Sequence, residues 1–292
     1  MSKRNAKSDR DPAPAAGDAD LALERLRRHL QFLGLTHTLA TLDDHLAWAT
    51  RERPGTTALF EHVLAAEVAE KLDQRIAYRV NRSGLKERKT LEAFDFDFQS
   101  KLDRSTVIEL ARLDFVRRHD DVVITGKAGT GKSHILKAFA LRACEQGIRM
   151  RYARCVDLLD DLHAAIADGS YPRRLKGWAS AELLIIDDVG LGQIKKRDDE
   201  PTAAHTLYNL IDRRHGRAST AVTSNIALSD WGRYLGDATL TAAILDRLAM
   251  HAVRIDIDGP SYRQHVAEER AAIAAGRKTK TPKGVDSAPK ER

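Results

Sequence analysis

The chain has 292 residues and a hydrophobic content of 42%, which allow one large globular domain and a smaller second one. Its longest apolar runs are far too short to span a bilayer, and residues 1–20 lack the apolar core of a signal peptide, so a cytoplasmic protein is expected rather than a membrane or secreted one. The two cysteines lie outside any metal-binding motif, which argues against a disulfide framework or a zinc site.

The net charge of +6 is concentrated in two segments. Residues 71–89 carry seven basic side chains against two acids, and residues 277–292 carry six against two, so these segments hold net charges of +5 and +4. The rest of the chain is left at −3. Charge that is segregated in this way predicts contact with a polyanion through appendages of the main domain.

Residues 1–20 are rich in Ala, Asp, Pro and Lys and are expected to form a disordered tail. Leucines at helical spacing then predict two helices, which end at Gly34 and before Pro54, and a third helix begins near Thr57. Four basic residues follow in the third helix at spacings of four, four and three: Lys71, Arg75, Arg79 and Arg82. These spacings place them in one stripe. Residues 21–88 are therefore expected to be a small all-helical domain whose stripe contacts DNA or a partner protein.

A charged junction leads into the main domain, which is expected at residues 89–265. Phe94, Phe96 and Phe98 alternate with polar residues, a pattern typical of an extended segment that lays its aromatic side on a core. A helix is predicted from about Ser105 to Arg118, ahead of a β-branched strand at residues 121–125.

Residues 126–133 read G-x-x-x-x-G-K-S, a complete phosphate-binding loop between that strand and a helix predicted at residues 134–146. In such a loop, backbone N–H groups surround the α- and β-phosphates, Lys132 adds a positive charge near the β- and γ-phosphates, and the Ser133 hydroxyl ligates Mg²⁺. An ordinary glycine turn is a poor alternative, because strand, loop and helix follow in the required order. The candidate nucleotide-binding residues are Gly126, Lys127, Ala128, Gly129, Thr130, Gly131, Lys132, Ser133 and His134.

Strands and helices alternate from the loop to about residue 258, which predicts a parallel sheet covered by helices on both faces. The further strands are expected at residues 149–155, 183–187, 220–223 and 253–257. The apolar run before Asp187 and Asp188 places both acids at the carboxyl end of a buried strand, the edge where α/β sheets bind ligands. We expect Asp187 to hold the Mg²⁺ shell and Asp188 to act as general base toward the attacking water. Two solvated acids in a strand-end turn are the alternative.

Two further residues are candidates for the hydrolysis site. Asn225 follows the strand at 220–223 and could orient the water or the γ-phosphate, although Asn at a strand end is also a common turn residue. Arg247 lies late in a predicted helix and could reach the γ-phosphate of a neighbouring subunit as an arginine finger. An intramolecular ion pair with Asp246 or another acid is an equal alternative on the residues alone.

Several motifs occur in one order along the chain: Lys89–Phe96, Gly126–Ser133, Leu183–Gly190, Thr223–Asn225, Asp230–Gly232, Leu245–Leu248 and Gly259–Arg263. Over about residues 20–265 this order resembles the IstB-like ATPases, helper proteins of insertion-sequence transposases and relatives of DnaC-type helicase loaders. The resemblance implies an AAA+ P-loop fold, ATP and Mg²⁺ as cofactors, Lys132 and Ser133 at the phosphates and metal, Asp187 and Asp188 as Walker B acids, Asn225 as sensor and Arg247 as finger.

Two departures from the family pattern stand out. Lys127 and Ala128 occupy positions where relatives usually have proline, and Asp188 stands where many other AAA+ proteins have glutamate. The shorter carboxylate implies slow turnover.

The resemblance implies a DNA-dependent ATPase that assembles on double-stranded DNA as a homo-oligomer and activates or targets a transposase. A DnaC-like loader of a replicative helicase is the alternative, and a P-loop kinase or a scaffold that never hydrolyses ATP is less favoured. DNA could also be held by Lys195-Lys196-Arg197 or by the tail after Arg277, since residues 266–292 are expected to be basic and largely disordered.

Overall fold

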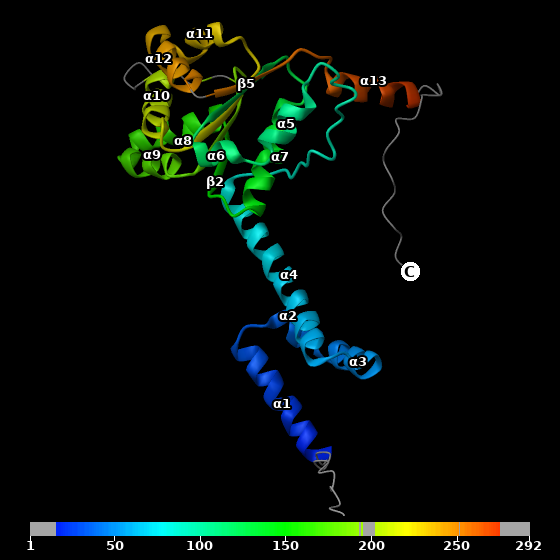
Figure 1. Cartoon of the computed structure of the whole chain (residues 1–292). Helices are drawn as coiled ribbons and strands as arrows, with labels where there is room; N and C mark the ends of the chain where they lie inside the picture. Colours follow the sequence, from blue (N-terminus) through cyan, green and yellow to red (C-terminus); the bar gives the residue numbers. More distant parts are fainter. Residues whose placement is uncertain (1–15, 193, 195–201, 251, 275–292) are drawn as a thin grey trace, which may run out of the picture. The chain divides into compact units, whose positions relative to one another are not determined.

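The computed structural model describes residues 16–192, 194, 202–250 and 252–274, drawn in colour in Figure 1. The chain divides into two compact units, residues 1–77 and 78–292. The basic loop at Lys195-Lys196-Arg197 and the basic tail after Arg277 lie outside the described residues. Among the helices that are described, none is long and apolar enough to cross a membrane.

Unit 1 is helical, as the leucine spacing predicts. Helix α1 (Ala16–Phe32) starts inside the segment expected to be a disordered tail. The second predicted helix is two helices, α2 (Thr36–Ala40) and α3 (Leu42–Glu52), because Thr41 leaves helical geometry with φ −106° and ψ 14°. The spacing of the leucines continues across Thr41, so the sequence pattern does not mark the break. Helix α4 (Thr56–Ser83) begins in unit 1 and ends in unit 2.

Unit 2 is built on a five-stranded sheet in the order β2-β3-β4-β1-β5. Its strands are β1 (Asp121–Gly126), β2 (Met150–Arg154), β3 (Leu183–Val189), β4 (Ser219–Ser224) and β5 (Ala252–Ile257). All neighbouring pairs are parallel, which confirms the predicted sheet. Parallel strands end at one edge, so the residues that follow β1, β3 and β4 meet there.

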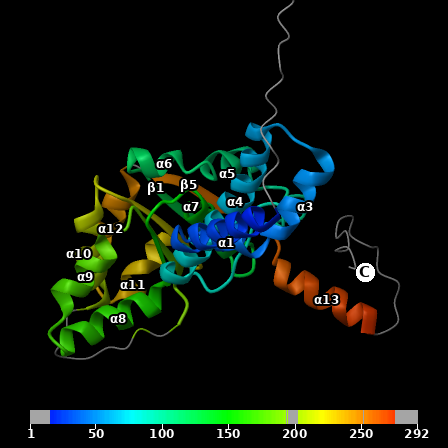
Figure 2. The same cartoon turned by 90° about the horizontal axis from the view of Figure 1, so that it is seen from below.

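Helices cover both faces of the sheet (Figure 2). On one face, α8 (Cys155–Ala167), α10 (Ala203–Arg214) and α12 (Ala238–Ala249) bury side chains against β3 and β4. On the other face lies α7 (Lys132–Glu145), where the ring centroid of Phe139 is 6.5 Å from that of Phe115. The remaining elements are α9 (Tyr171–Ala179), η1 (Leu228–Asp230), α11 (Trp231–Leu235) and α13 (Tyr262–Ala274). With the phosphate loop between β1 and α7, this arrangement is the expected AAA+ P-loop fold.

In unit 2, two local predictions are wrong. The helix expected from Ser105 to Arg118 is two short helices, α5 (Arg104–Leu110) and α6 (Asp114–Arg118), because the fully buried Leu113 adopts a left-handed conformation with φ 64°.

The segment from Phe94 to Phe98 consists of turns instead of extended chain. One turn is closed by the Asp95 carboxylate, which accepts a hydrogen bond from the Phe98 N–H at 2.8 Å. The alternation still describes burial correctly, since Phe94 is buried while Asp95 and Asp97 are exposed. Burial and backbone conformation are thus separate properties of this segment.

Candidate nucleotide-binding and hydrolysis site

The phosphate loop connects β1 to α7, and its three glycines all have positive φ angles. A Cβ atom at any of them would collide with a neighbouring segment: at Gly126 with the carbonyl oxygen of Ile257, at Gly129 with the side chain of Ser261, and at Gly131 with the ring of Phe94. The loop therefore needs glycine both for its backbone conformation and for the space around it.

Lys132, the first residue of α7, is the buried cation of the site. Its Nζ donates hydrogen bonds to the carbonyl oxygens of Gly126 at 2.8 Å and Lys127 at 2.7 Å. Burial lowers the pKa of Lys132 to about 8, against the attraction of Asp188 and Asp187 and with a further lowering by Arg263. An ammonium that is desolvated in this way fits a site for anionic phosphates, whose charge would compensate it.

Asp187, on β3, is held by three hydroxyl groups. The Ser133 hydroxyl donates to its Oδ1 at 2.9 Å, Thr223 donates to the same oxygen, and Tyr152 donates to Oδ2. Only 1% of Asp187 is exposed. A fixed carboxylate beside a serine hydroxyl provides the oxygen ligands that Mg²⁺ prefers, so the residues predicted to hold the metal fit that role.

Asp188 lies next to the loop and, unlike Asp187, has a left-handed backbone conformation. Its φ angle is +61°, and its N–H donates to Thr223 Oγ1 at 2.8 Å, where the pairing of β3 with β4 is irregular. The side-chain amide of Asn225 donates to Asp188 Oδ1 at 3.0 Å, and the Ser133 hydroxyl lies 3.5 Å from the same oxygen. The structure thus brings together the predicted base and the predicted sensor at the edge of the sheet.

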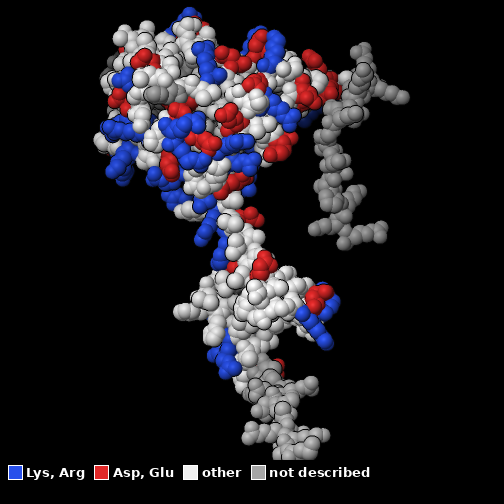
Figure 3. Space-filling model, in the orientation of Figure 1, with Lys and Arg blue, Asp and Glu red and all other residues white. Residues whose placement is uncertain are grey.

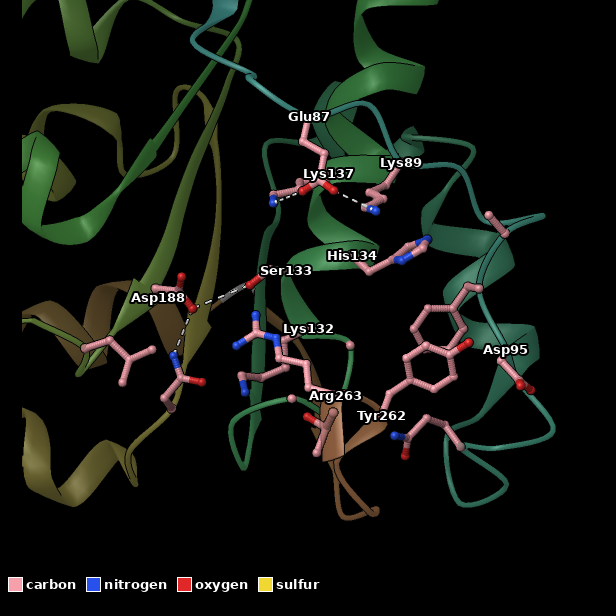
Figure 4. Close-up of a pocket in the computed structure, with 18 residues that line it drawn as sticks. Glu87, Lys89, Asp95, Lys132, Ser133, His134, Lys137, Asp188, Tyr262 and Arg263 are labelled. Atoms are coloured by element: carbon pink, nitrogen blue, oxygen red, sulfur yellow. Dashed lines mark hydrogen bonds and ion pairs between the residues drawn. The ribbon is translucent and has the colours of Figure 1, made fainter. Parts of the chain in front are cut away.

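Several of these residues line a cavity of about 290 Å³, shown in Figure 4. The candidate residues on its wall are Gly129, Thr130, Gly131, Lys132, Ser133, His134, Asp188 and Asn225. Gly126, Lys127, Ala128 and Asp187 are not part of the wall, although Gly126 and Lys127 bind Lys132 and Asp187 binds Ser133. His134 donates from Nε2 to the Thr90 carbonyl oxygen, 2.8 Å away, and burial lowers the pKa of His134.

The cavity wall also contains residues to which the sequence assigned no role. Arg263, at the start of α13, is the most informative, because the adjacent Tyr262 N–H donates to the Gly129 carbonyl oxygen at 2.9 Å and so fixes α13 to the loop. Phe94 closes the side of the cavity at Gly131. The available signal for Arg263 was a basic residue in Gly259-Pro260-Ser261-Tyr262-Arg263, the segment that follows the last strand.

Glu87 forms an ion pair with each of two lysines at the upper edge of the cavity in Figure 4. Its carboxylate lies 2.8 Å from Lys137 Nζ and 2.7 Å from Lys89 Nζ. Hydrogen bonds from Lys137 and Lys89 lower the pKa of Glu87 to about 2. The acid therefore neutralises part of the positive charge at this edge.

Arg247, on α12, is not on the wall of this cavity. Its Nε lies 2.9 Å from Asp212 Oδ1, its Nη2 donates to the Tyr208 hydroxyl at 2.8 Å, and its guanidinium stacks 4.6 Å from the Tyr208 ring centroid. The intramolecular ion pair is present within this chain, with Asp212 as partner instead of Asp246. A role as an arginine finger in trans stays a prediction.

The basic stripe of α4 is divided between the two units, with Lys71 and Arg75 in unit 1 and Arg79 and Arg82 in unit 2. Lys71 Nζ donates to the Gly34 carbonyl oxygen at 2.8 Å and pairs with the buried Glu67 at 3.3 Å. Arg79 donates to the Cys144 carbonyl oxygen at 3.1 Å and Arg82 to the Tyr78 hydroxyl at 2.8 Å, while Arg75 is exposed. Three of the four cations thus have partners within the chain, and their contact with DNA stays a prediction.

Comparison with known proteins identifies the family. IstB-like ATP-binding proteins match this chain over residues 28–270. An ATP-binding protein, by its assigned name, of insertion sequence IS5376 from Geobacillus stearothermophilus is 32% identical over 201 residues, 69% of this chain and 78% of that protein. A similarly named protein of insertion sequence IS21 from Pseudomonas aeruginosa is 38% identical over 184 residues, 63% of this chain and 67% of that protein. The solved structure of DnaI resembles 60% of this chain and 90% of its own, with 20% identity and a TM-score of 0.47. The chain belongs to the family of IstB-like ATP-binding proteins.

Proposed function

We propose that this protein is a DNA-dependent AAA+ ATPase that assembles on double-stranded DNA as a homo-oligomer and activates or targets a transposase. The observation that carries hydrolysis, beyond nucleotide binding, is the grouping of Ser133, Asp187, Asp188 and Asn225 around one edge of the loop. The transposition role is supported by the names of the relatives, which belong to insertion sequences.

In the proposed reaction, bound ATP and Mg²⁺ supply the phosphoryl group and the metal charge. Lys132 and the loop N–H groups hold the phosphates and offset their charge. Three hydroxyl donors keep Asp187 oriented, and Asp187 and Ser133 are the residues that would hold Mg²⁺. Asp188 accepts the proton of the attacking water, and Asn225 holds the Asp188 carboxylate in place.

A loader of a replicative helicase is the second proposal, since the IstB-like ATPases that the motif order resembles are relatives of DnaC-type helicase loaders. The two share this hydrolysis site and differ in the protein that they contact. Purification of the full chain with its partners from its own cells would distinguish them, because a transposase supports the first proposal and a replicative helicase the second.

Hydrolysis is tested directly by phosphate release from ATP with and without duplex DNA. We expect slow release that DNA accelerates. Release that is the same with and without DNA would contradict DNA dependence, and no release under either condition would favour a nucleotide-bound scaffold. Phosphate that is transferred to an added acceptor instead of water would favour a kinase.

A further inference from the structure

Unit 2 has a second cavity, of about 510 Å³, that shares no lining residue with the nucleotide cavity. It lies where the last turns of α4, the end of α7 and the start of β2 come together. Of the residues that the structure describes, no acid lines this cavity, whereas four arginines do: Arg79, Arg82, Arg149 and Arg151. In Figure 3, Lys and Arg side chains gather on the part of unit 2 where Figure 1 draws β2 and the end of α4. We call this cavity, with its four arginines, the arginine groove.

Three of the four guanidinium groups are held by neutral partners. Arg79 donates to the Cys144 carbonyl oxygen, Arg82 donates to the Tyr78 hydroxyl, and Arg151 lies 3.4 Å from the centroid of the Trp178 ring. Such contacts fix the position of a guanidinium without neutralising its charge. Each guanidinium carries five N–H donors, so donors remain for an incoming anion.

The acids near the arginine groove do not balance its charge. Glu182 pairs with Arg149 at 3.0 Å, but that arginine side chain is 73% exposed. Asp161 is already bound by Arg174 and by the Trp178 indole N–H, both at 2.7 Å. Burial lowers the pKa of Arg151, Asp161 opposes this shift and Arg174 adds to it. The groove therefore keeps an excess of positive charge.

We propose that the arginine groove binds the phosphate backbone of duplex DNA. This inference rests on the proposed DNA-dependent function and names the surface of unit 2 that carries it. Arginine forks bind phosphate oxygens in pairs, and several forks at one surface suit the repeated charges of a phosphodiester chain. Since such contacts do not read base edges, binding is independent of DNA sequence and weakens steeply with salt.

The groove is also connected to the hydrolysis site through β2. Arg151 faces the groove, and the next residue, Tyr152, points to the opposite side of the strand and donates to Asp187. DNA in the groove would contact the strand that orients the metal-binding acid. This gives a short physical route by which DNA could change the rate of hydrolysis.

The test uses the full chain with Arg82→Glu and Arg149→Glu, because both side chains are exposed. The matched control is Arg117→Glu with Arg233→Glu, two exposed arginines elsewhere on unit 2 that undergo the same change of charge. Binding of a fluorescent duplex of mixed sequence is measured at several salt concentrations. We expect the groove variant to lose at least about tenfold in affinity and the slope of log K against log salt to fall by about 2, with much smaller changes in the control.

Each outcome bears on a different part of the inference. Equal losses in the groove and control variants, or an unchanged salt slope, would overturn the assignment of the groove while leaving DNA dependence intact. No duplex binding by the parent chain at low salt would overturn the proposed function as well. Poly-glutamate that competes as strongly as duplex DNA would mean that the groove takes an acidic protein surface instead. Unchanged binding of an ATP analogue by both variants checks that they are folded.

Discussion

The Tyr152 hydroxyl donates a hydrogen bond to Asp187 Oδ2, on the side of the carboxylate away from Ser133. Burial raises the pKa of Tyr152 above its ordinary value, and the neighbouring carboxylate of Asp187 adds to the shift. Tyr152 therefore remains a neutral donor at every pH at which the protein would work. It contacts the acid and is not on the wall of the nucleotide cavity, which makes it a positioning residue.

Replacing this donor should weaken the metal site. For Tyr152→Phe we expect kcat to fall about tenfold, because a hydrogen bond to a charged group contributes about 1.5–3 kcal/mol and only part of it bears on the reaction. The Mg²⁺ concentration needed for half-maximal hydrolysis should rise, while binding of ATP without Mg²⁺ stays the same.

Tyr171→Phe is the matched control, since the Tyr171 hydroxyl accepts from Asn209 at 3.3 Å and lies outside the nucleotide cavity. Parent-like Mg²⁺ dependence in Tyr152→Phe would show that Asp187 is oriented well enough by Ser133 and Thr223.

Substitutions of Lys132 and Asp187 should affect nucleotide binding and ATP hydrolysis differently. Lys132→Ala is expected to lose ATP binding or turnover, because it removes the buried charge beside the loop. Asp187→Asn is expected to keep nucleotide bound and to lose Mg²⁺-dependent hydrolysis by at least about a hundredfold. Equilibrium binding of a fluorescent ATP analogue and phosphate release measure the two properties. Hydrolysis at the parent rate in either variant would disprove the site assignment.

Nucleotide affinity should depend on pH through Lys132. Burial holds the pKa of this lysine near 8 in the free protein, below the ordinary value of 10.5, so above pH 8 most free protein has a neutral lysine. Phosphates favour the charged form, and binding must then take up a proton. We therefore expect affinity to fall by up to about tenfold per pH unit above pH 8 and to be nearly flat below it.

Calorimetry in buffers of different ionisation enthalpy would detect this proton. Lys132→Arg should show no proton uptake, because arginine stays charged throughout. Affinity that is constant between pH 7.5 and 9.5 in the parent chain would contradict the prediction.

The left-handed conformation of Asp188 predicts what its substitution does. Aspartate and asparagine adopt this conformation more readily than glutamate, since their short polar side chains can bond locally. Asp188→Asn should therefore keep its stability and lose hydrolysis by about a hundredfold or more. Asp188→Glu should lower stability by about 1 kcal/mol, a drop of a few degrees in Tm.

Asp160→Glu is the control for the second substitution, because Asp160 is an exposed residue within α8. Faster hydrolysis in Asp188→Glu than in the parent chain would show that carboxylate length, and not backbone conformation, limits the rate.

Whether Arg247 acts on the ATP site of a neighbouring subunit can be tested by mixing variant chains. If it acts in trans, Arg247→Ala should bind ATP and lose hydrolysis by about a thousandfold, and adding Lys132→Ala chains should restore part of the activity. Restoration is expected because the Lys132→Ala chain still offers an intact Arg247 to its neighbour. If co-assembly is shown and no mixing ratio restores activity, the ion pair with Asp212 is the role of this arginine. In that case Arg247→Ala and Asp212→Asn should lower the Tm by similar amounts, because each removes the same ion pair.

The sequence predicted the parts of the site that follow from strand order along the chain. Asp187 ends the strand predicted at residues 183–187, Asp188 comes next, and Asn225 lies just after the strand predicted at 220–223, so their meeting at one edge was expected. Tyr152 was not, because its contact with Asp187 depends on β2 lying beside β3, and no local pattern specifies which strands are neighbours.

The basic stripe of α4 is a second feature that the sequence predicted only in part. The spacing placed four cations correctly on one helix, but the groups that bind them come from segments distant in sequence, such as Gly34 and Cys144. A periodic pattern specifies the direction of side chains and leaves their partners undetermined.

The enclosure of the phosphate loop has a consequence for synthesis of the chain. Phe94 reaches the loop from before the sheet, whereas Ile257 and Ser261 reach it from the end of the last strand and beyond. During translation the loop leaves the ribosome well before these last residues do. The nascent chain can therefore complete its nucleotide pocket only after residue 261 has emerged. A transcript or protein cut short before that point would yield a chain with an intact loop sequence and an open, incomplete pocket.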